Sequence, residues 1–217
     1  MDLDCMVGMR REPINVAEGD YALDVHVHMY TLSLETQTRR LGYDIPDRGF
    51  SMMPSVPRPR SRDRSWLHSA DPSVKPAVDF RYFTDPEGYD EATLVAGIKL
   101  CRTIAAQKPF KDRIVREVAP GPSVQTDEAI SEFGRKAANT VYHPCGSAKM
   151  GNVETDSMAV VDSELKVRGL RKLRIADASV FPVITTLNPI VTVLCIGERA
   201  AEMVAGELGW IQGLSKL

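Results

Sequence analysis

The alternation of apolar and polar residues in the stretch at positions 21–32, YALDVHVHMYTL, constrains the fold more than any other stretch of this chain. Alternation with a period of two is the pattern of a β-strand, whose successive side chains point to opposite faces. The apolar members are Leu23, Val25, Val27 and Met29, and the polar members are Asp24, His26, His28 and Tyr30. We therefore predict a strand with one apolar face and one polar face that carries two histidines.

The next stretch, residues 42–66, is rich in proline and arginine. Its prolines exclude a helix and restrict any strand to a sheet edge or a short piece. Four large apolar side chains give the stretch something to bury: Phe50, Met52, Met53 and Trp66. The run of arginines from Arg58 to Arg64 leaves two interpretations open, a solvated loop, which is the more common outcome, and a surface that binds a partner.

Capping signals and helical spacing predict three helices. The first spans residues 86–107, with Asp85 as its N-cap and a proline at its first position. The second spans residues 126–138 and has two acidic residues in its first turn, where the helix dipole favours them. The third spans residues 189–206. Between the second and third helices we expect short extended pieces interrupted by Gly169.

Composition and charge narrow the classes of function. The 217 residues include 27 Lys and Arg against 29 Asp and Glu, and this balance gives no electrostatic case for binding nucleic acid or an anionic membrane. The four cysteines form no Cys-x-x-Cys pair, which predicts neither a zinc cluster nor a disulfide framework. No apolar run approaches the ~20 residues of a membrane span, and no signal pattern is present. We expect a cytoplasmic protein that acts on a small molecule or a protein partner.

A histidine motif, VYHPCGSAKMG at residues 141–151, suggests chemistry. An imidazole such as that of His143 exchanges a proton near neutral pH, and Gly146 and Gly151 permit close approach of a bulky ligand. Asn188 places a second polar side chain at an element end, as the predicted N-cap of the third helix. Taken alone, the motif fits a packed histidine in a turn equally well.

The pair of histidines in the predicted strand has a form that metal sites also use. His26 and His28 are two residues apart and project from the same face. No third ligand follows at a spacing typical of zinc sites, so no metal is expected.

Three segments in order, HPCGSAKMG, VVDSELKVRGLRKLRIADASVFP and an Asn-Pro dipeptide at a helix start, resemble the C-terminal signature of the glucose-methanol-choline (GMC) oxidoreductases. These are flavoenzymes that oxidise alcohols. Upstream, RSRDR and KPAVDFRYFTDPEGYD also resemble segments of this family. The resemblance covers residues 28–206 and implies an α+β fold. This fold is the substrate-binding half of such an enzyme, an antiparallel sheet packed with helices, with a C-terminal segment that returns to the FAD domain.

The same resemblance implies how the chain is divided. A weakly matched start (1–20) is followed by a substrate-binding region (21–140), the signature segment with the flavin-facing helix (141–206) and a tail (207–217). No G-x-G-x-x-G motif followed by a distant acidic residue occurs in the chain, so the Rossmann-like part of the family is expected to be absent.

The resemblance also implies roles for individual residues. His143 would assist removal of the alcohol proton and then stabilise the alkoxide, with Asn188 as its partner across the substrate oxygen. His28 and Tyr142 would bind the substrate.

For the cofactor FAD, the resemblance implies contacts with Asp177, Ala178 and the helix start formed by Asn188, Pro189 and Ile190. A helix N-terminus stabilises the negative charge that a flavin gains with a hydride. An alternative for Asp177 is a turn residue that bonds nearby backbone. Ile190 stands where the family usually has a polar residue, which favours less polar substrates or a weaker oxidase.

The expected function is hydride transfer from choline or another primary alcohol to FAD, which yields an aldehyde. The alternative is a truncated, non-catalytic remnant that lacks flavin and acts only with a partner chain. The expected partners are the alcohol and FAD, with no nucleic acid. A returning segment without its partner domain exposes apolar surface, so self-association into a homo-oligomer is also expected.

Overall fold

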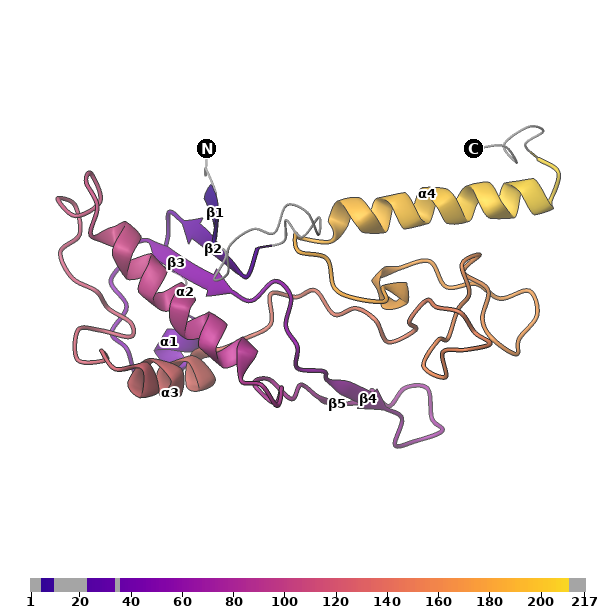
Figure 1. The fold of residues 1–217 in the computed structure, drawn as a ribbon, viewed down its shortest axis with the longest axis horizontal. Coiled ribbons are helices and arrows are strands. Elements are labelled where there is room, and N and C mark those ends of the chain that lie inside the picture. The colour runs from indigo at the N-terminus through magenta and orange to yellow at the C-terminus, as the bar shows by residue number, and fades with distance from the viewer. Residues whose placement is uncertain (1–4, 10–22, 34–35, 211–217) are drawn as a thin grey trace. The chain divides into compact units, whose positions relative to one another are not determined.

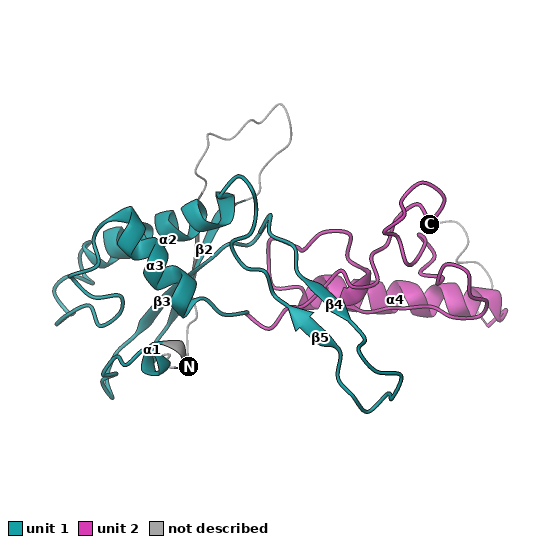
Figure 2. Ribbon diagram, turned by 90° about the horizontal axis from the view of Figure 1, so that it is seen from below, with its two compact units in different colours: residues 1–140 teal, residues 141–217 magenta. Residues whose placement is uncertain are grey.

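The structure of the protein, a computed structural model, describes residues 5–9, 23–33 and 36–210. These residues form two units, divided between Thr140 and Val141, which Figure 2 distinguishes by colour. Each unit has its own cluster of buried apolar side chains. Among the described helices, none combines the length and the apolar content that crossing a membrane requires.

The first unit is built on a three-stranded antiparallel sheet with the order β1-β2-β3 (Figure 1). The strands are β1 (Cys5–Met9), β2 (Val25–Tyr30) and β3 (Ser51–Ser55). The strand expected within residues 21–32 is confirmed as β2, although Tyr21 and Ala22 lie outside the described residues. β3 contains Pro54 and lies at an edge of the sheet as far as the structure describes it, as the proline content predicted.

Helix α2 (Tyr89–Ala105) covers one face of this sheet. The approach is close at Gly97, where an added Cβ would lie 2.6 Å from the Pro54 Cβ and 3.1 Å from Val25 Cγ1. Helix α3 (Asp127–Ala137) packs on α2 through Ile130, which is fully buried. A short helix, α1 (Thr36–Arg40), was not predicted. The expected antiparallel sheet packed with helices is therefore confirmed.

The predicted start of the first helix at Pro86 is wrong. Residues 85–88 form a turn, and Gly88, with φ of 65°, is the N-cap of a helix that begins at Tyr89. Asp85 still caps this helix, because its carboxylate accepts a hydrogen bond of 2.6 Å from the Tyr89 N–H. The second helix begins and ends within one residue of its prediction, with the Thr126 hydroxyl accepting from the Ala129 N–H.

The arginine-rich segment is tied to the start of α2. The Asp90 carboxylate accepts hydrogen bonds from the backbone N–H groups of Arg60 (2.7 Å) and Ser61 (2.9 Å). The Ser61 hydroxyl oxygen in turn accepts from the backbone N–H of Asp85 at 3.1 Å. The Arg60 guanidinium lies over the Tyr89 ring, 4.2 Å from its centroid.

A small hairpin follows, formed by β4 (Arg64–Trp66) and β5 (Ala77–Asp79). Arg64 pairs with Asp79 across it at 3.4 Å, and Arg62 donates to the Pro59 carbonyl. The arginines of this segment are thus engaged within their own unit, which disfavours a surface built to bind a partner.

The second unit consists of short extended pieces and one long helix, α4 (Ile190–Glu207). Its core contains Val161, Leu165, Val180 and Phe181, on which Val193, Ile196 and Ala200 of α4 pack. Isolated bridges join the extended pieces, pairing Met150 with Val161, Val161 with Val167 and Lys166 with Arg174. This agrees with the short extended pieces expected between the second and third helices.

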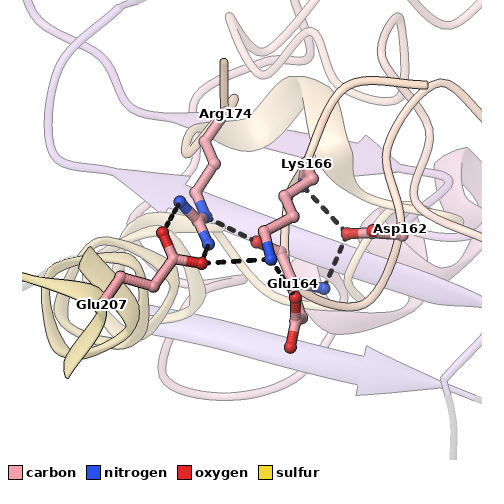
Figure 3. Close-up of polar contacts among 5 residues, drawn as sticks. All are labelled: Asp162, Glu164, Lys166, Arg174 and Glu207. Carbon is pink, nitrogen blue, oxygen red and sulfur yellow. Dashed lines mark hydrogen bonds and ion pairs between the residues drawn. The ribbon is translucent and has the colours of Figure 1, made fainter. Parts of the chain in front are cut away.

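A charged cluster holds the C-terminal end of α4 (Figure 3). Glu207 accepts hydrogen bonds from the Arg174 guanidinium at 2.7 and 3.0 Å and pairs with Lys166 at 3.1 Å. Arg174 also donates to the Glu164 carbonyl, and Asp162 accepts from the backbone N–H groups of Glu164 and Lys166. The hydrogen bonds from Arg174 and Lys166 lower the pKa of Glu207 to about 2.

Candidate active site

The histidine motif begins with backbone in an unusual conformation. Tyr142, which is exposed, has φ of 65°, a region that bulky side chains rarely adopt and that is often found at functional sites. His143 follows and is half-buried. Gly146 has φ of 81°, and a Cβ there would lie 3.3 Å from the Phe181 carbonyl oxygen. At this position the close backbone approach and the positive φ both favour glycine.

Three backbone hydrogen bonds fix the motif to the segment that carries the predicted flavin contacts. The N–H groups of Gly146, Ala148 and Met150 donate to the carbonyls of Ala178 (3.2 Å), Ser179 (2.8 Å) and Val180 (2.9 Å), in that order. On its other side the motif bonds to residues 160–161, since the Val160 N–H donates to the Lys149 carbonyl at 2.8 Å. The segment after His143 is therefore held from two sides.

An ion pair that the sequence did not reveal closes the loop after the motif. The Lys149 Nζ lies 2.6 Å from the Asp156 carboxylate. The hydrogen bond from Lys149 lowers the pKa of Asp156, with a further contribution from the Met158 N–H. A Lys and an Asp seven residues apart in a loop carry no periodic signal, so sequence reasoning could not have found this pair.

Asp177 makes the local contacts of a turn residue. Its carboxylate accepts from the backbone N–H of Ser179 at 2.8 Å and from the Ser179 hydroxyl, and both bonds lower the pKa of Asp177. It thereby caps the short 3-10 helix Ala178–Val180. The alternative that assigned Asp177 to a turn describes these contacts correctly, and a flavin contact at Asp177 stays a prediction.

The predicted N-cap of the last helix is wrong. The N-cap is Pro189, because its carbonyl accepts the first helical hydrogen bond, from Val193 at 2.9 Å. Asn188 lies one residue earlier and is exposed, and the N-cap residue Pro189 makes no side-chain hydrogen bond to the helix. Pro189 is buried, whereas the side chains of Ile190 and Val191 are 63% and 67% exposed.

The second unit brings three predicted segments onto one core. Cys145 of the histidine motif, Ala178 and Val193 of α4 all pack against the cluster around Val180 and Phe181. The motif, the turn after Asp177 and the helix that begins after Asn188 are therefore neighbours in one packed unit.

His28 lies in the first unit, on the central strand β2. Its ring stacks on Tyr30, with centroids 6.4 Å apart and an angle of 15°, and makes an edge contact with His26 at 6.4 Å. His26 is only 4% exposed. The face of β2 that carries the histidines was predicted to be polar, but at His26 it is buried. In the described part of the chain, no three His, Cys, Asp or Glu side chains gather into a group that could hold a metal.

Comparison with known proteins gives consistent matches. The sequence model of the GMC oxidoreductase family matches residues 59–197. The chain is 47% identical over 181 residues to the choline oxidase of Arthrobacter globiformis, covering 83% of this chain and 33% of the relative. It is 40% identical over 148 residues to the oxygen-dependent choline dehydrogenase of Rhizobium rhizogenes, covering 68% and 26% of the two chains.

A solved structure agrees with the sequence matches. A formate oxidase of Aspergillus oryzae, whose FAD modification is the subject of that structure, superposes with a TM-score of 0.74 at 25% identity. The superposition covers 88% of this chain and 34% of the formate oxidase. The chain spans about a quarter to a third of the length of the curated relatives it matches. The family match covers well over half of this chain, and the protein therefore belongs to the GMC oxidoreductase family.

Proposed function

We propose that this protein takes part in the oxidation of an alcohol with FAD as the hydride acceptor. One observation carries the proposal: the family match at residues 59–197 includes the His143 motif, which three backbone hydrogen bonds hold against the turn after Asp177. The names of two relatives, choline oxidase and choline dehydrogenase, support choline or a similar primary alcohol as the substrate. The exposed Ile190 at the helix start favours a less polar alcohol.

The proposed roles follow from the chemistry of the side chains. His143 accepts the hydroxyl proton of the alcohol and then hydrogen-bonds the alkoxide. Asn188 donates a second hydrogen bond to the same oxygen through its amide. His28 and Tyr142 position the alcohol. Residues 21–140 would then serve as the substrate-binding region and residues 141–206 as the catalytic and flavin-facing region.

The start of α4 fits a flavin. FAD, when bound, supplies the hydride acceptor. The N-cap residue Pro189 makes no side-chain hydrogen bond to this 18-residue helix, and the first backbone N–H groups of a helix favour a negatively charged group. The exposed side chains of Ile190 and Val191 favour contact with a flat, partly apolar ring. We expect Asn188, Pro189 and Ile190 to contact one end of the ring system, and Asp177 and Ala178 to contact the ribityl and phosphate region.

An absorption experiment tests the proposal. The purified chain is incubated with excess FAD, gel-filtered and then mixed anaerobically with choline. A retained flavin band that bleaches is the expected result. A flavin-free protein supports the alternative, a chain that acts only together with a partner chain, and contradicts catalysis by this chain alone.

A pair of histidine variants tests the role of His143. In a flavin-loaded protein, His143→Ala should slow bleaching by roughly 10²–10⁴-fold while flavin stays bound, the usual contribution of general acid–base catalysis. His68→Ala is the matched control, because His68 is exposed in the loop between β4 and β5 and has no proposed role. A loss smaller than about tenfold in His143→Ala would refute the assignment.

A further inference from the structure

Positive charge is concentrated in one short segment of the second unit, residues 166–174. Five of these nine residues are Lys or Arg and none is acidic, although the charge of the whole chain is nearly balanced. We call this segment the basic hairpin, because an antiparallel bridge joins Lys166 to Arg174 and the Val167 N–H donates to the Leu173 carbonyl at 3.0 Å. The balance of the whole chain therefore does not describe the charge of this surface.

The base of the basic hairpin is fixed to the rest of the second unit. Val167 packs against the buried core cluster of this unit. The Arg174 guanidinium and the Lys166 ammonium both pair with Glu207 at the end of α4, as Figure 3 shows. Residues 168–173 form the tip of the hairpin, which this base holds at the surface.

The tip carries cations without a partner beside exposed leucines. In the part of the chain that the structure describes, no carboxylate pairs with the side chains of Arg168, Arg171 or Lys172, and all three residues are exposed. Leu170 and Leu173 are 59% and 48% exposed. Free cations beside exposed apolar side chains suit the interface of an anionic bilayer, where headgroups attract the cations and the apolar groups leave water.

A hollow of about 330 Å³ lies between the basic hairpin and the end of α4. Four cations and two leucines of the hairpin line it, together with the carboxylate of Glu207. A second hollow, lined by Arg168, also has Glu154 and Asp162 in its wall. The surplus of positive charge is therefore greatest at the first hollow, which has room for a phosphate headgroup.

Two more apolar side chains follow α4 directly. Leu208 and Trp210 are both exposed, and they come just after Glu207, which Arg174 ties to the basic hairpin. Tryptophan is enriched at the boundary between headgroups and acyl chains, because its ring has an apolar body and a polar N–H. The end of α4 therefore places further apolar side chains beside the basic hairpin.

We propose that the basic hairpin and the end of α4 bind the surface of an anionic membrane. Arg171 and Lys172 contact the headgroup phosphates, and Leu170 and Leu173 enter the boundary between headgroups and acyl chains together with Trp210. The leucines favour a bilayer over nucleic acid, whose outer surface offers phosphates and sugars rather than an apolar layer. This contact is independent of flavin and of the alcohol.

Co-sedimentation with vesicles tests the proposal on the full chain. Vesicles of phosphatidylglycerol and phosphatidylcholine in equal parts should bind the protein, and vesicles of phosphatidylcholine alone should bind it much more weakly. Each cation beside an anionic surface strengthens binding about fivefold, so the double variant R171Q/K172Q should bind the mixed vesicles roughly 20–30-fold more weakly. The double variant K111Q/R113Q is the matched control, because it removes the same charge from exposed positions of the first unit.

A leucine variant separates insertion into the bilayer from electrostatic attraction. The double variant L170S/L173S keeps every cation and should bind the mixed vesicles roughly tenfold more weakly, because less apolar surface leaves water. In Trp66→Phe, Trp210 is the remaining tryptophan, and its emission should shift to shorter wavelength when mixed vesicles are added. Amide proton spectra check that each variant keeps its fold.

Equal binding to the two kinds of vesicle, or binding that both hairpin variants leave unchanged, would overturn the proposal. An unchanged Trp210 emission while the protein sediments with lipid would also contradict it. A doubled mass in gel filtration, with no lipid binding, would show that a second copy covers this surface instead. Binding that depends on Arg171 and Lys172 but not on the leucines would indicate an acidic protein partner and would contradict insertion into a bilayer.

Discussion

The contact between Asp90 and the arginine-rich segment predicts a large loss of stability on a single substitution. Asp90 is 3% exposed, and its carboxylate accepts the N–H groups of Arg60 and Ser61 at 2.7 and 2.9 Å. The two segments are far apart in sequence, so these bonds join the stretch before β4 to the first turn of α2. Asp90→Ala removes both acceptors and leaves two amides without a partner inside the unit.

The structure sets the size of the effect. An unsatisfied buried amide costs about 1–3 kcal/mol, and loss of a carboxylate from the first turn of a helix costs about 0.3–1 kcal/mol. The two amides are only partly buried and water reaches them in the variant, so we expect a loss of about 3 kcal/mol, the lower half of the combined range. Asp90→Asn keeps one acceptor oxygen and should cost about half as much.

Hydrogen–deuterium exchange measures this loss directly. The amides of α2 report the unfolding free energy of the first unit, and the Arg60 and Ser61 amides report the local contact. Glu132→Ala is the matched control, because it removes an exposed carboxylate whose pairing with Lys136, four residues on, contributes little to stability. An Asp90→Ala variant as stable as this control, with protection of Arg60 and Ser61 unchanged, would refute the reasoning.

Glu207→Gln should remove the contribution of Glu207 to the acid destabilisation of the second unit between pH 4.5 and about 2, the window between the unperturbed and folded pKa of Glu207. In this window the unfolded state binds more protons than the folded state, so the stability that the Arg174–Glu207 pair contributes is lost as the pH falls. If the melting temperatures of the unmodified chain and of Glu207→Gln changed equally across the window, the prediction would be contradicted. Cys101 should be alkylated far more slowly than the exposed Cys195, because burial raises the pKa of the Cys101 thiol to about 12. Site-resolved mass spectrometry measures the two alkylation rates, and equal rates would count against the burial of Cys101. Lys172→Gly should stabilise the second unit by roughly 0.5–1 kcal/mol, since φ of 63° costs a non-glycine residue about 1–2 kcal/mol and the more flexible unfolded chain offsets part of that gain. A lower melting temperature would show that this turn is not strained.

The sequence predicted those helices and strands that are determined by patterns within a few neighbouring residues. The period-two pattern around Val25 and Val27 predicted β2, and the Thr126 cap predicted α3 within one residue, because both patterns act within a few neighbouring residues. The start of α2 was missed because Asp-Pro-Glu-Gly fits either a capped helix or a turn. Asp85 reaches the N–H of Tyr89 four residues later, across a turn that ends at a glycine.

Contacts between distant segments could not be read from the sequence. The burial of His26 depends on strands that pair on both sides of β2, which a single-strand pattern does not contain. The hydrogen bonds that join Gly146 and Ala148 to residues 178–179 link positions about 30 residues apart. An Asn-Pro dipeptide does not say which of its two residues closes the first helical turn, and here it is Pro189.

The position of Pro54 bears on how the chain behaves when concentrated. An outer strand offers unpaired backbone groups to a strand from another molecule, and β3 is such a strand in the described sheet. β3 (Ser51–Ser55) has no charged residue to repel a neighbour. Pro54, which lies opposite Val27, has no N–H to offer, so a ladder added along this edge is interrupted within the strand. Fibre-like growth from β3 is therefore disfavoured by the backbone itself.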